Sequence, residues 1–291
     1  MNLPICQGPD PKPKTPKFNL PSKACDTHAH IFGPVLKFPY EKNRAYTPPE
    51  ALLPAYKTVL ETLGIERGVI VHASMLGVDN ASTLDVLSQL GDNFRGIAVI
   101  HPDIKRKDLS SLTEKGMRGA RVSTYVTGGS QAKELEKLSN LIADFGWITE
   151  IHLGNVNELI ELAPVLRKLP TPYLIDHLGR VKGSQGKNCL GFQTLLCLMS
   201  DDPNCWVKLS SFYRLSSSGP PNYEDMMPMA LALISICPER IVWGTNWPHP
   251  IFDGPMPNDG DLLDLIYEWI PDQTNRKKIF IDNPSKLFGF D

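Results

Sequence analysis

The 291-residue chain lacks the features that mark several large protein classes. No run approaches the ~18 consecutive apolar residues of a membrane span, so the sequence predicts no transmembrane segment. Neither charge sign is in excess, because 30 Lys and Arg face 32 Asp and Glu; this excludes a strong global field for nucleic acid or an anionic membrane. The phosphate-binding loop, the nucleophile elbow and the HExxH motif are also missing, which argues against nucleotide hydrolysis, serine hydrolases and zincins.

Secretion signals and disulfide spacing are absent as well. Residues 1–22 carry six prolines and scattered lysines without an apolar core, so we expect an extended N-terminal arm, loose or lying along the domain or a second copy of the chain. The six cysteines lack CxxC spacing and several fall in apolar stretches, which favours buried reduced thiols. These features are typical of a cytoplasmic protein that binds neither nucleic acid nor membrane, and they leave a homo-oligomer open.

Apolar runs of strand length recur along residues 23–291, each followed by a segment of helical length. The runs are Lys23–His30, Arg67–Ser74, Phe94–Asp103, Met117–Thr124, Trp147–Gly154, Tyr173–Arg180, Cys205–Phe212 and Arg240–Pro248. Predicted helices include Pro49–Leu63, Asn80–Leu90, Lys133–Phe145, Val156–Leu169, Gly191–Ser200 and Glu224–Cys237. Eight such units predict an α/β fold, a single-domain (β/α)₈ barrel of the TIM type. An open doubly wound sheet is the alternative, but it usually has fewer strands, and no GxGxxG follows the first run.

The carboxyl ends of the predicted strands carry the chain's histidines. Active sites of such barrels lie at these ends. All seven histidines fall at or near one: His28, His30, His72, His101, His152, His177 and His249. This distribution favours a site built from imidazoles over histidines that only pack in the core.

His28-Ala-His30 is the strongest local feature. Residues i and i+2 of a strand point to the same side, so both imidazoles face one interior space. Such a pair suits a divalent metal, or an anion if the imidazoles are protonated. His152 on the fifth strand and His177 on the sixth extend the set.

Several polar residues near the strand ends have plain structural interpretations as well. Asp176 can be a structural carboxylate, because the residue after it points to the other side, and Asn246 can form a turn after the eighth strand. Arg121, Arg180 and Arg214 can be solvated surface side chains. All three lie at or just beyond strand ends, however, where converging guanidiniums would bind a carboxylate bidentately.

Six motifs give the sequence a family resemblance. They are CDTHAHIFGP (25–34), FPY (38–40), YTPPEA (46–51), DNASTLD (79–85), IDHLGR (175–180) and WGTNWPHP (243–250). Together they resemble the amidohydrolase superfamily, in the branch that contains 2-pyrone-4,6-dicarboxylate lactonase, sulfomuconolactone hydrolase and sugar lactonases. The likeness runs in order from about residue 22 to the C-terminus. It implies a distorted (β/α)₈ barrel that opens a lactone by hydrolysis.

The resemblance also implies roles for single residues. His28 and His30 match the first-strand histidine pair of the family, and His177 matches the sixth-strand histidine that polarises the scissile carbonyl. The residues that match substrate-anion contacts are Tyr46, Ser74, Arg121, Arg180 and Arg214.

Three positions depart from the pattern of the pyrone lactonase. Asn246 stands where that pattern has an aspartate as general base, and an amide cannot take a proton from water, although a related lactone isomerase branch also carries Asn there. Thr127 stands where a second substrate-binding arginine is expected, which weakens the case for a dicarboxylate. His152 replaces a tyrosine, as in amidohydrolases that use a metal.

Three hypotheses follow from these departures. In the first, a lactonase holds one divalent metal, zinc by ligand type, on His28, His30, His152 and His177, and metal and histidine activate the water. In the second, the pyrone lactonase pattern of working without metal holds: an imidazole is the base, or the reaction is an intramolecular lactone isomerisation. In the third, favoured by the missing aspartate, the barrel is a decarboxylating or non-catalytic relative.

Retention of the histidines and arginines favours an enzyme. We expect a hydrolase that opens the ester bond of a small carboxylated lactone, similar to a 2-pyrone-dicarboxylate, a muconolactone or an aldarolactone, in aromatic or sugar-acid breakdown. The expected catalytic residues are His28, His30, His177 and Asn246. They would polarise the ester carbonyl and orient the attacking water. The expected substrate contacts are Tyr46, Ser74, Arg121, Arg180 and Arg214.

Overall fold

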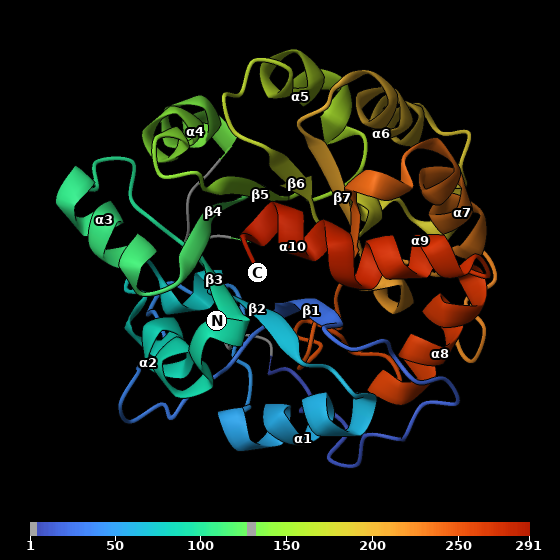
Figure 1. Ribbon diagram of the computed structural model, residues 1–291, viewed down its shortest axis with the longest axis horizontal. Coiled ribbons are helices and arrows are strands. Elements are labelled where there is room, and N and C mark those ends of the chain that lie inside the picture. The colour runs from blue at the N-terminus through green and yellow to red at the C-terminus, as the bar shows by residue number, and fades with distance from the viewer. Residues whose placement is uncertain (1–4, 127–131) are drawn as a thin grey trace.

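The computed structural model describes residues 5–126 and 132–291. Eight parallel strands form one sheet in sequence order, and a bridge between Ala29 and Trp247 joins the first strand to the segment after the last (Figure 1). The strands are β1 (Cys25–Ala29), β2 (Arg67–Val71), β3 (Phe94–Ala98), β4 (Met117–Ser123), β5 (Ile148–His152), β6 (Tyr173–Ile175), β7 (Cys205–Leu209) and β8 (Ile241–Trp243). Each strand lies inside one of the eight predicted apolar runs. The predicted (β/α)₈ barrel is confirmed.

Helices surround the strands (Figure 1). They are α1 (Leu53–Leu63), α2 (Ala81–Leu90), α3 (Arg106–Glu114), α4 (Leu135–Ala143), α5 (Glu158–Leu166), α6 (Leu190–Asp201), α7 (Met227–Ile236), α8 (Asp259–Trp269), α9 (Gln273–Lys277) and α10 (Asn283–Phe288). The six predicted helices correspond to α1, α2 and α4 to α7, with ends that differ by at most four residues. The helices α3 and α8 to α10 were not among those predicted.

The C-terminal helix closes one end of the barrel. In Figure 1, α10 lies across the middle of the ring of strands. A buried cluster joins Leu287, Phe288 and Phe290 to side chains from seven of the eight strands. The guanidiniums of Arg67 and Arg95, at the starts of β2 and β3, also lie over the Phe290 ring. Among the described residues, this packing closes the amino ends of the strands, so the carboxyl ends form the open end of the barrel.

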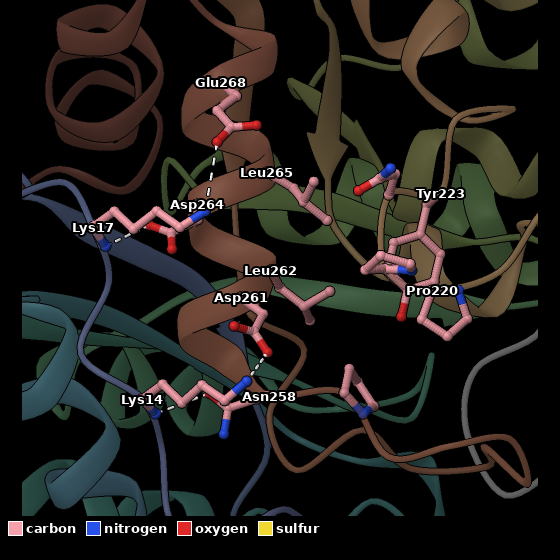
Figure 2. Close-up of a pocket in the computed structure, with 13 residues that line it drawn as sticks. Lys14, Lys17, Pro220, Tyr223, Asn258, Asp261, Leu262, Asp264, Leu265 and Glu268 are labelled. Carbon is pink, nitrogen blue, oxygen red and sulfur yellow. Dashed lines mark hydrogen bonds and ion pairs between the residues drawn. The ribbon is translucent and has the colours of Figure 1, made fainter.

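The N-terminal arm lies along the same chain's barrel. The backbone amides of Lys14 and Lys17 donate hydrogen bonds to the side chains of Asn258 (2.9 Å) and Asp264 (2.7 Å). Figure 2 shows both lysines against α8, beside a surface hollow that also reaches residues 220–223. Gly260 permits this close approach, because a Cβ there would lie 2.1 Å from the Lys14 carbonyl oxygen. Arm and helix therefore pack backbone to backbone at the start of α8.

Two expectations about the whole chain can be compared with the structure. All six cysteines are unpaired, but only Cys25, Cys205 and Cys237 are buried, while Cys197 is exposed. The prediction of reduced thiols agrees with this, and the prediction of general burial is too broad, because Cys197 lies on the outer face of α6. Among the described residues, no helix has both the length and the apolar character needed to cross a membrane.

Candidate active site

The first and eighth strands meet at a buried carboxylate. Asp26 accepts hydrogen bonds from the backbone amides of His28 (3.0 Å) and Thr245 (2.9 Å), and from the Thr245 hydroxyl (2.7 Å). Gly244 allows the close approach of the two segments, since a Cβ there would lie 2.7 Å from the His28 Cβ. The backbone N–H of Asn246 donates a hydrogen bond to the backbone carbonyl of His28 (2.8 Å). This junction fixes the backbone that carries both the first histidine and Asn246.

His28 and His30 point into one space, with their Nε2 atoms 3.2 Å apart. Nδ1 of His30 donates to the Val71 carbonyl (2.7 Å), which leaves the lone pair of neutral His30 on Nε2. Nδ1 of His28 lies 2.8 Å from the Lys208 ammonium, a donor, so the hydrogen of neutral His28 is on Nε2. The two tautomers are complementary, and His28 donates to His30.

Two further imidazoles continue this cluster. Nδ1 of His177 lies 2.7 Å from the Ser210 hydroxyl, and Nδ1 of His152 lies 3.3 Å from the Ser123 hydroxyl. The ring centroids of His177 and His28 are 4.9 Å apart, and those of His177 and His152 are 5.4 Å apart. Each of the four imidazoles thus has a partner on Nδ1. The four predicted metal-ligand histidines form one contiguous group.

Four buried charges lie beside the histidines. The Lys208 ammonium contacts carboxylate oxygens of Glu150 (2.6 Å) and Asp176 (3.0 Å). The Arg121 guanidinium contacts the same two carboxylates, at 3.4 Å and 3.1 Å. The two cations and two anions cancel in formal charge, and removing any one would leave an unpaired charge in the barrel interior.

Sequence reasoning found Arg121 and Asp176 but missed Glu150 and Lys208. The signal was present, because Glu150 interrupts the apolar run of β5 and Lys208 that of β7. A charged residue in a strand buried on both faces needs a buried partner of opposite charge. Two such residues of opposite sign in one barrel therefore predict an internal ion pair.

Burial holds these imidazoles in their neutral form. Burial, and then the Arg121 charge, lower the pKa of His30 to about 3. Burial likewise holds the pKa of His28, His152 and His177 well below the ordinary value, and for His177 it outweighs the attraction of Asp176. At neutral pH the cluster presents N–H donors and lone pairs. Anion binding by protonated imidazoles, one of the two options for the first pair, does not fit this environment.

The donor set fits a divalent metal. In the described part of the chain, one group of His, Cys, Asp or Glu residues has ligand atoms within 4.8 Å of one another: His28, Asp176 and His177. His152 adds a buried Nε2 that has no hydrogen-bond partner within the described residues. The Nδ1 partners of His30 and His177 are of the kind that orients an imidazole whose Nε2 binds a metal.

A small cavity opens among these side chains at the carboxyl ends of the strands. Its lining is His30, Tyr46, Ser74, Arg121, Val126, His152, His177, Arg214, Asn246, Pro250 and Ile251. The structure thus brings together every predicted site residue except His28, which lies beneath the lining, and Arg180. The cavity measures about 20 Å³, which holds a water molecule. A ring compound enters only when lining side chains move apart.

The arginines of the site differ in their partners. Arg214 lines the cavity, and its guanidinium makes no hydrogen bond or ion pair with another residue of the described ranges. Nε of Arg180 donates to the Gly154 carbonyl (3.1 Å), and its guanidinium lies 3.8 Å from the centre of the Tyr125 ring. The Arg214 guanidinium lies 6.0 Å from the same ring centre. Thr127 lies outside the described residues.

Comparisons with known proteins agree with this arrangement. A profile of the family described as Amidohydrolase matches residues 25–290. The chain is 39% identical to a 4-sulfomuconolactone hydrolase of Rhizobium radiobacter, over 99% of this chain and 97% of that protein. It is 34% identical to a 2-pyrone-4,6-dicarboxylate hydrolase of Comamonas testosteroni, over 95% and 93%.

A solved structure shows the same fold. A crystal structure of an Agrobacterium tumefaciens protein superposes with a TM-score of 0.86 at 28% identity, covering 95% of this chain and 99% of the other. The family profile, the full-length relatives and the barrel with its histidine cluster lead to one assignment. The chain belongs to the amidohydrolase family.

Proposed function

We propose that the chain is an enzyme, a hydrolase that opens the ester bond of a small carboxylated lactone. The names of two full-length relatives support this class. The observation that carries it is the guanidinium of Arg214, unpaired among the described residues, which lines the same cavity as the neutral imidazoles of His30 and His177. A ring carboxylate would pair with Arg214 while the ester carbonyl meets the imidazoles. Rings similar to a 2-pyrone-dicarboxylate, a muconolactone or an aldarolactone, from aromatic or sugar-acid breakdown, fit this chemistry.

The other predicted anion contacts differ in how well they could bind the substrate carboxylate. Arg121 is already paired with two carboxylates, so it adds positive potential but has fewer free donors. Arg180 lies at the mouth against an aromatic ring. Tyr46 and Ser74 line the cavity, and burial raises the pKa of Tyr46, which keeps its hydroxyl a donor. Arg214 therefore provides the main carboxylate contact.

The side chains of the cluster divide the hydrolytic step among them. Without a metal, the Ser210 hydroxyl can donate to Nδ1 of His177, which places the His177 hydrogen on Nε2, where it can bond to the carbonyl oxygen. If His177 held a metal through Nε2, its hydrogen would be on Nδ1 and would bond to the Ser210 hydroxyl. Asn246 orients the attacking water. The water oxygen bonds to the carbonyl carbon, its proton passes to an imidazole lone pair of the cluster, and the ring oxygen leaves as a hydroxyl after taking that proton.

One divalent metal, zinc by its affinity for imidazole, is the cofactor of this proposal. His28, His30, His152 and His177 would hold it. Zinc bound there supplies a water with a pKa of ~7, which eases the absence of an aspartate base. To bind a metal through Nε2, His28 would need the tautomer with its hydrogen on Nδ1. Nδ1 lies 3.5 Å from a carboxylate oxygen of Asp176, which could accept that hydrogen, and 2.8 Å from the Lys208 ammonium, which could not. Lys208 therefore opposes His28 as a ligand more than it opposes the other three.

A lactone panel with paired arginine variants tests the proposal. Acid release at constant pH is measured for carboxylated lactones and for lactones without a carboxylate, with hydrolysis expected for the first group. Arg214→Ala should raise KM about ten-fold or more, because the guanidinium–carboxylate pair is lost. Arg106→Ala removes an exposed guanidinium on α3 that pairs with Asp144, and KM should stay unchanged. The proposal is wrong if no lactone releases acid, or if both variants keep the wild-type KM.

Lactone isomerisation is a second candidate, favoured by Asn246 in place of a general base. Such a reaction moves the acyl group from the ring oxygen to another hydroxyl of the same molecule and consumes no water. Product analysis by NMR separates the two reactions, because an isomerase leaves a lactone and releases no acid.

A further inference from the structure

A buried chain of four polar side chains runs from the cavity to the start of α8. Nδ2 of Asn246 donates to the Tyr213 hydroxyl (2.9 Å), and that hydroxyl lies 2.8 Å from Nδ1 of His249. Nε2 of His249 lies 3.2 Å from Oδ1 of Asp259, the first residue of α8. None of the four is more than 3% exposed. Bulk solvent therefore does not compete for the bonds within this chain.

The carboxylate at its far end sets the direction of every bond. Nε2 of His249 and Oδ1 of Asp259 are in ion-pair contact without hydrogen-bond geometry, and neither atom has a hydrogen-bond partner among the described residues. The carboxylate oxygen has no hydrogen to offer and attracts one, so a His249 ring with one hydrogen carries it on Nε2. Nδ1 of His249 is then a lone pair, and the Tyr213 hydroxyl donates to it. The Tyr213 oxygen, having given its hydrogen, can only accept at residue 246. Asn246 meets this requirement with its Nδ2.

The amide of Asn246 is thereby fixed in one of its two orientations. Its second Nδ2 hydrogen is directed to the Ser211 hydroxyl (3.2 Å), so both donors are used. The carbonyl Oδ1 has no partner among the described residues, and Asn246 lines the cavity. The side chain therefore offers the cavity an acceptor and no donor, which suits the hydrogen of a water molecule.

The backbone around this chain is held in an uncommon conformation. Asn246 and His249 both have positive φ, at 61° and 60°. Asn tolerates this left-handed region better than most residues, whereas His adopts it at some cost. The His249 amide donates to the Asn246 carbonyl (2.8 Å), which closes the turn between them. This turn points the Asn246 side chain back toward Tyr213.

We infer that Tyr213, His249 and Asp259 are positioning residues that hold the Asn246 carbonyl oxygen as the acceptor for the attacking water. The inference rests on the proposed lactone chemistry for the identity of that water's target. It also explains an amide at position 246. An aspartate there would set its oxygen against the lone pair of the Tyr213 oxygen, so the chain demands a donor at this position.

Tyr213→Phe is the first test, because it removes the hydroxyl at nearly constant volume. The expected result is a fall in kcat of about ten-fold or more with KM within about two-fold, since Arg214 is untouched. Tyr173→Phe is the matched control: the residue is also buried and its hydroxyl donates to Asp202 (2.8 Å), and kcat should stay at the wild-type value. Equal kcat in wild type and Tyr213→Phe overturns the inference.

Two further variants separate positioning from a merely structural role. Asp259→Asn still offers a carbonyl acceptor to His249 and should keep most of kcat, whereas Asp259→Leu removes the acceptor and should lose as much as Tyr213→Phe. Asn246→Asp should lower kcat. An increase of kcat in Asn246→Asp above wild type would show that position 246 does not require a donor, and the inference fails.

A measurement without substrate distinguishes this inference from the proposed function. NMR of protein labelled with ¹⁵N-histidine, with the His249 signal assigned from its loss in His249→Gln, reports which ring nitrogen carries the hydrogen. The expected tautomer is Nε2–H with Nδ1 unprotonated. The Nδ1–H tautomer or an imidazolium overturns the hydrogen-bond chain. If instead wild type turns over no lactone but His249 has the expected tautomer, the chain stands and the proposed lactone reaction fails.

Discussion

His72 gives a quantitative prediction about acid stability. It follows β2, is fully buried, and bonds through Nδ1 to the Thr83 hydroxyl (2.8 Å), while its Nε2 has no hydrogen-bond partner within the described residues. Burial lowers its pKa to about 4, against smaller opposing effects of Asp79 and the Gly77 backbone. The folded chain therefore holds this imidazole neutral at pH values where the unfolded chain protonates it.

The sign and size of the effect follow from proton linkage. Above pH ~6.5 both states are neutral and His72 has no pH-dependent effect on stability. Below this value His72 is protonated in the unfolded state but stays neutral in the folded state until the pH nears 4. The free energy of unfolding therefore falls by about 1.4 kcal/mol per pH unit. Between pH 7 and pH 5 the loss attributable to His72 is about 2 kcal/mol.

Urea unfolding of wild type and His72→Asn, followed by circular dichroism from pH 5 to pH 7, isolates this contribution. Other buried groups act in both variants alike: the histidine cluster has the same sign, while Glu150 and Asp26, whose pKa values burial raises to about 7 and about 6, have the opposite sign. The variant should lose about 2 kcal/mol less than wild type over this range. His101→Asn, which changes an exposed histidine, should follow wild type. Identical pH dependence in wild type and His72→Asn would refute the reasoning.

Three more predictions concern the site and the arm. His177→Ala should lower kcat with a small effect on KM, because His177, as a donor to the carbonyl oxygen or as a metal ligand, acts on the charge that develops there; steady-state kinetics measures both. Chelation should remove about one zinc per chain and abolish lactone turnover, and a chain that elemental analysis finds without zinc but that is fully active would contradict the metal proposal. Gly260→Ala should lower the free energy of unfolding by about 1–3 kcal/mol and speed tryptic cleavage at Lys14, because the new Cβ would lie 2.1 Å from the Lys14 carbonyl oxygen. An unchanged melting temperature and cleavage rate would show that the arm does not pack there.

The contrast among the histidines shows how far strand-end position can predict a site. All seven lie near strand ends in the sequence, but only four form the cluster. His72 bonds to α2, His101 is exposed, and His249 turns toward α8. Position along a strand fixes the end of the barrel on which a side chain lies. It does not fix the direction of side chains that follow the strand in loops with irregular φ, such as His249.

The sequence by itself determined the barrel, because eight apolar runs separated by helical segments can bury their strands in few other ways. It also determined the His28–His30 pair, because the period of a strand is two residues. Tertiary structure alone decided which partner each polar side chain meets. Arg121 and Arg214 look alike in the sequence, yet β5 and the residue after β6 bring two carboxylates to Arg121 and none to Arg214 among the described residues. Those partners come from strands distant in sequence, and their short range of interaction makes every such choice depend on the closed barrel.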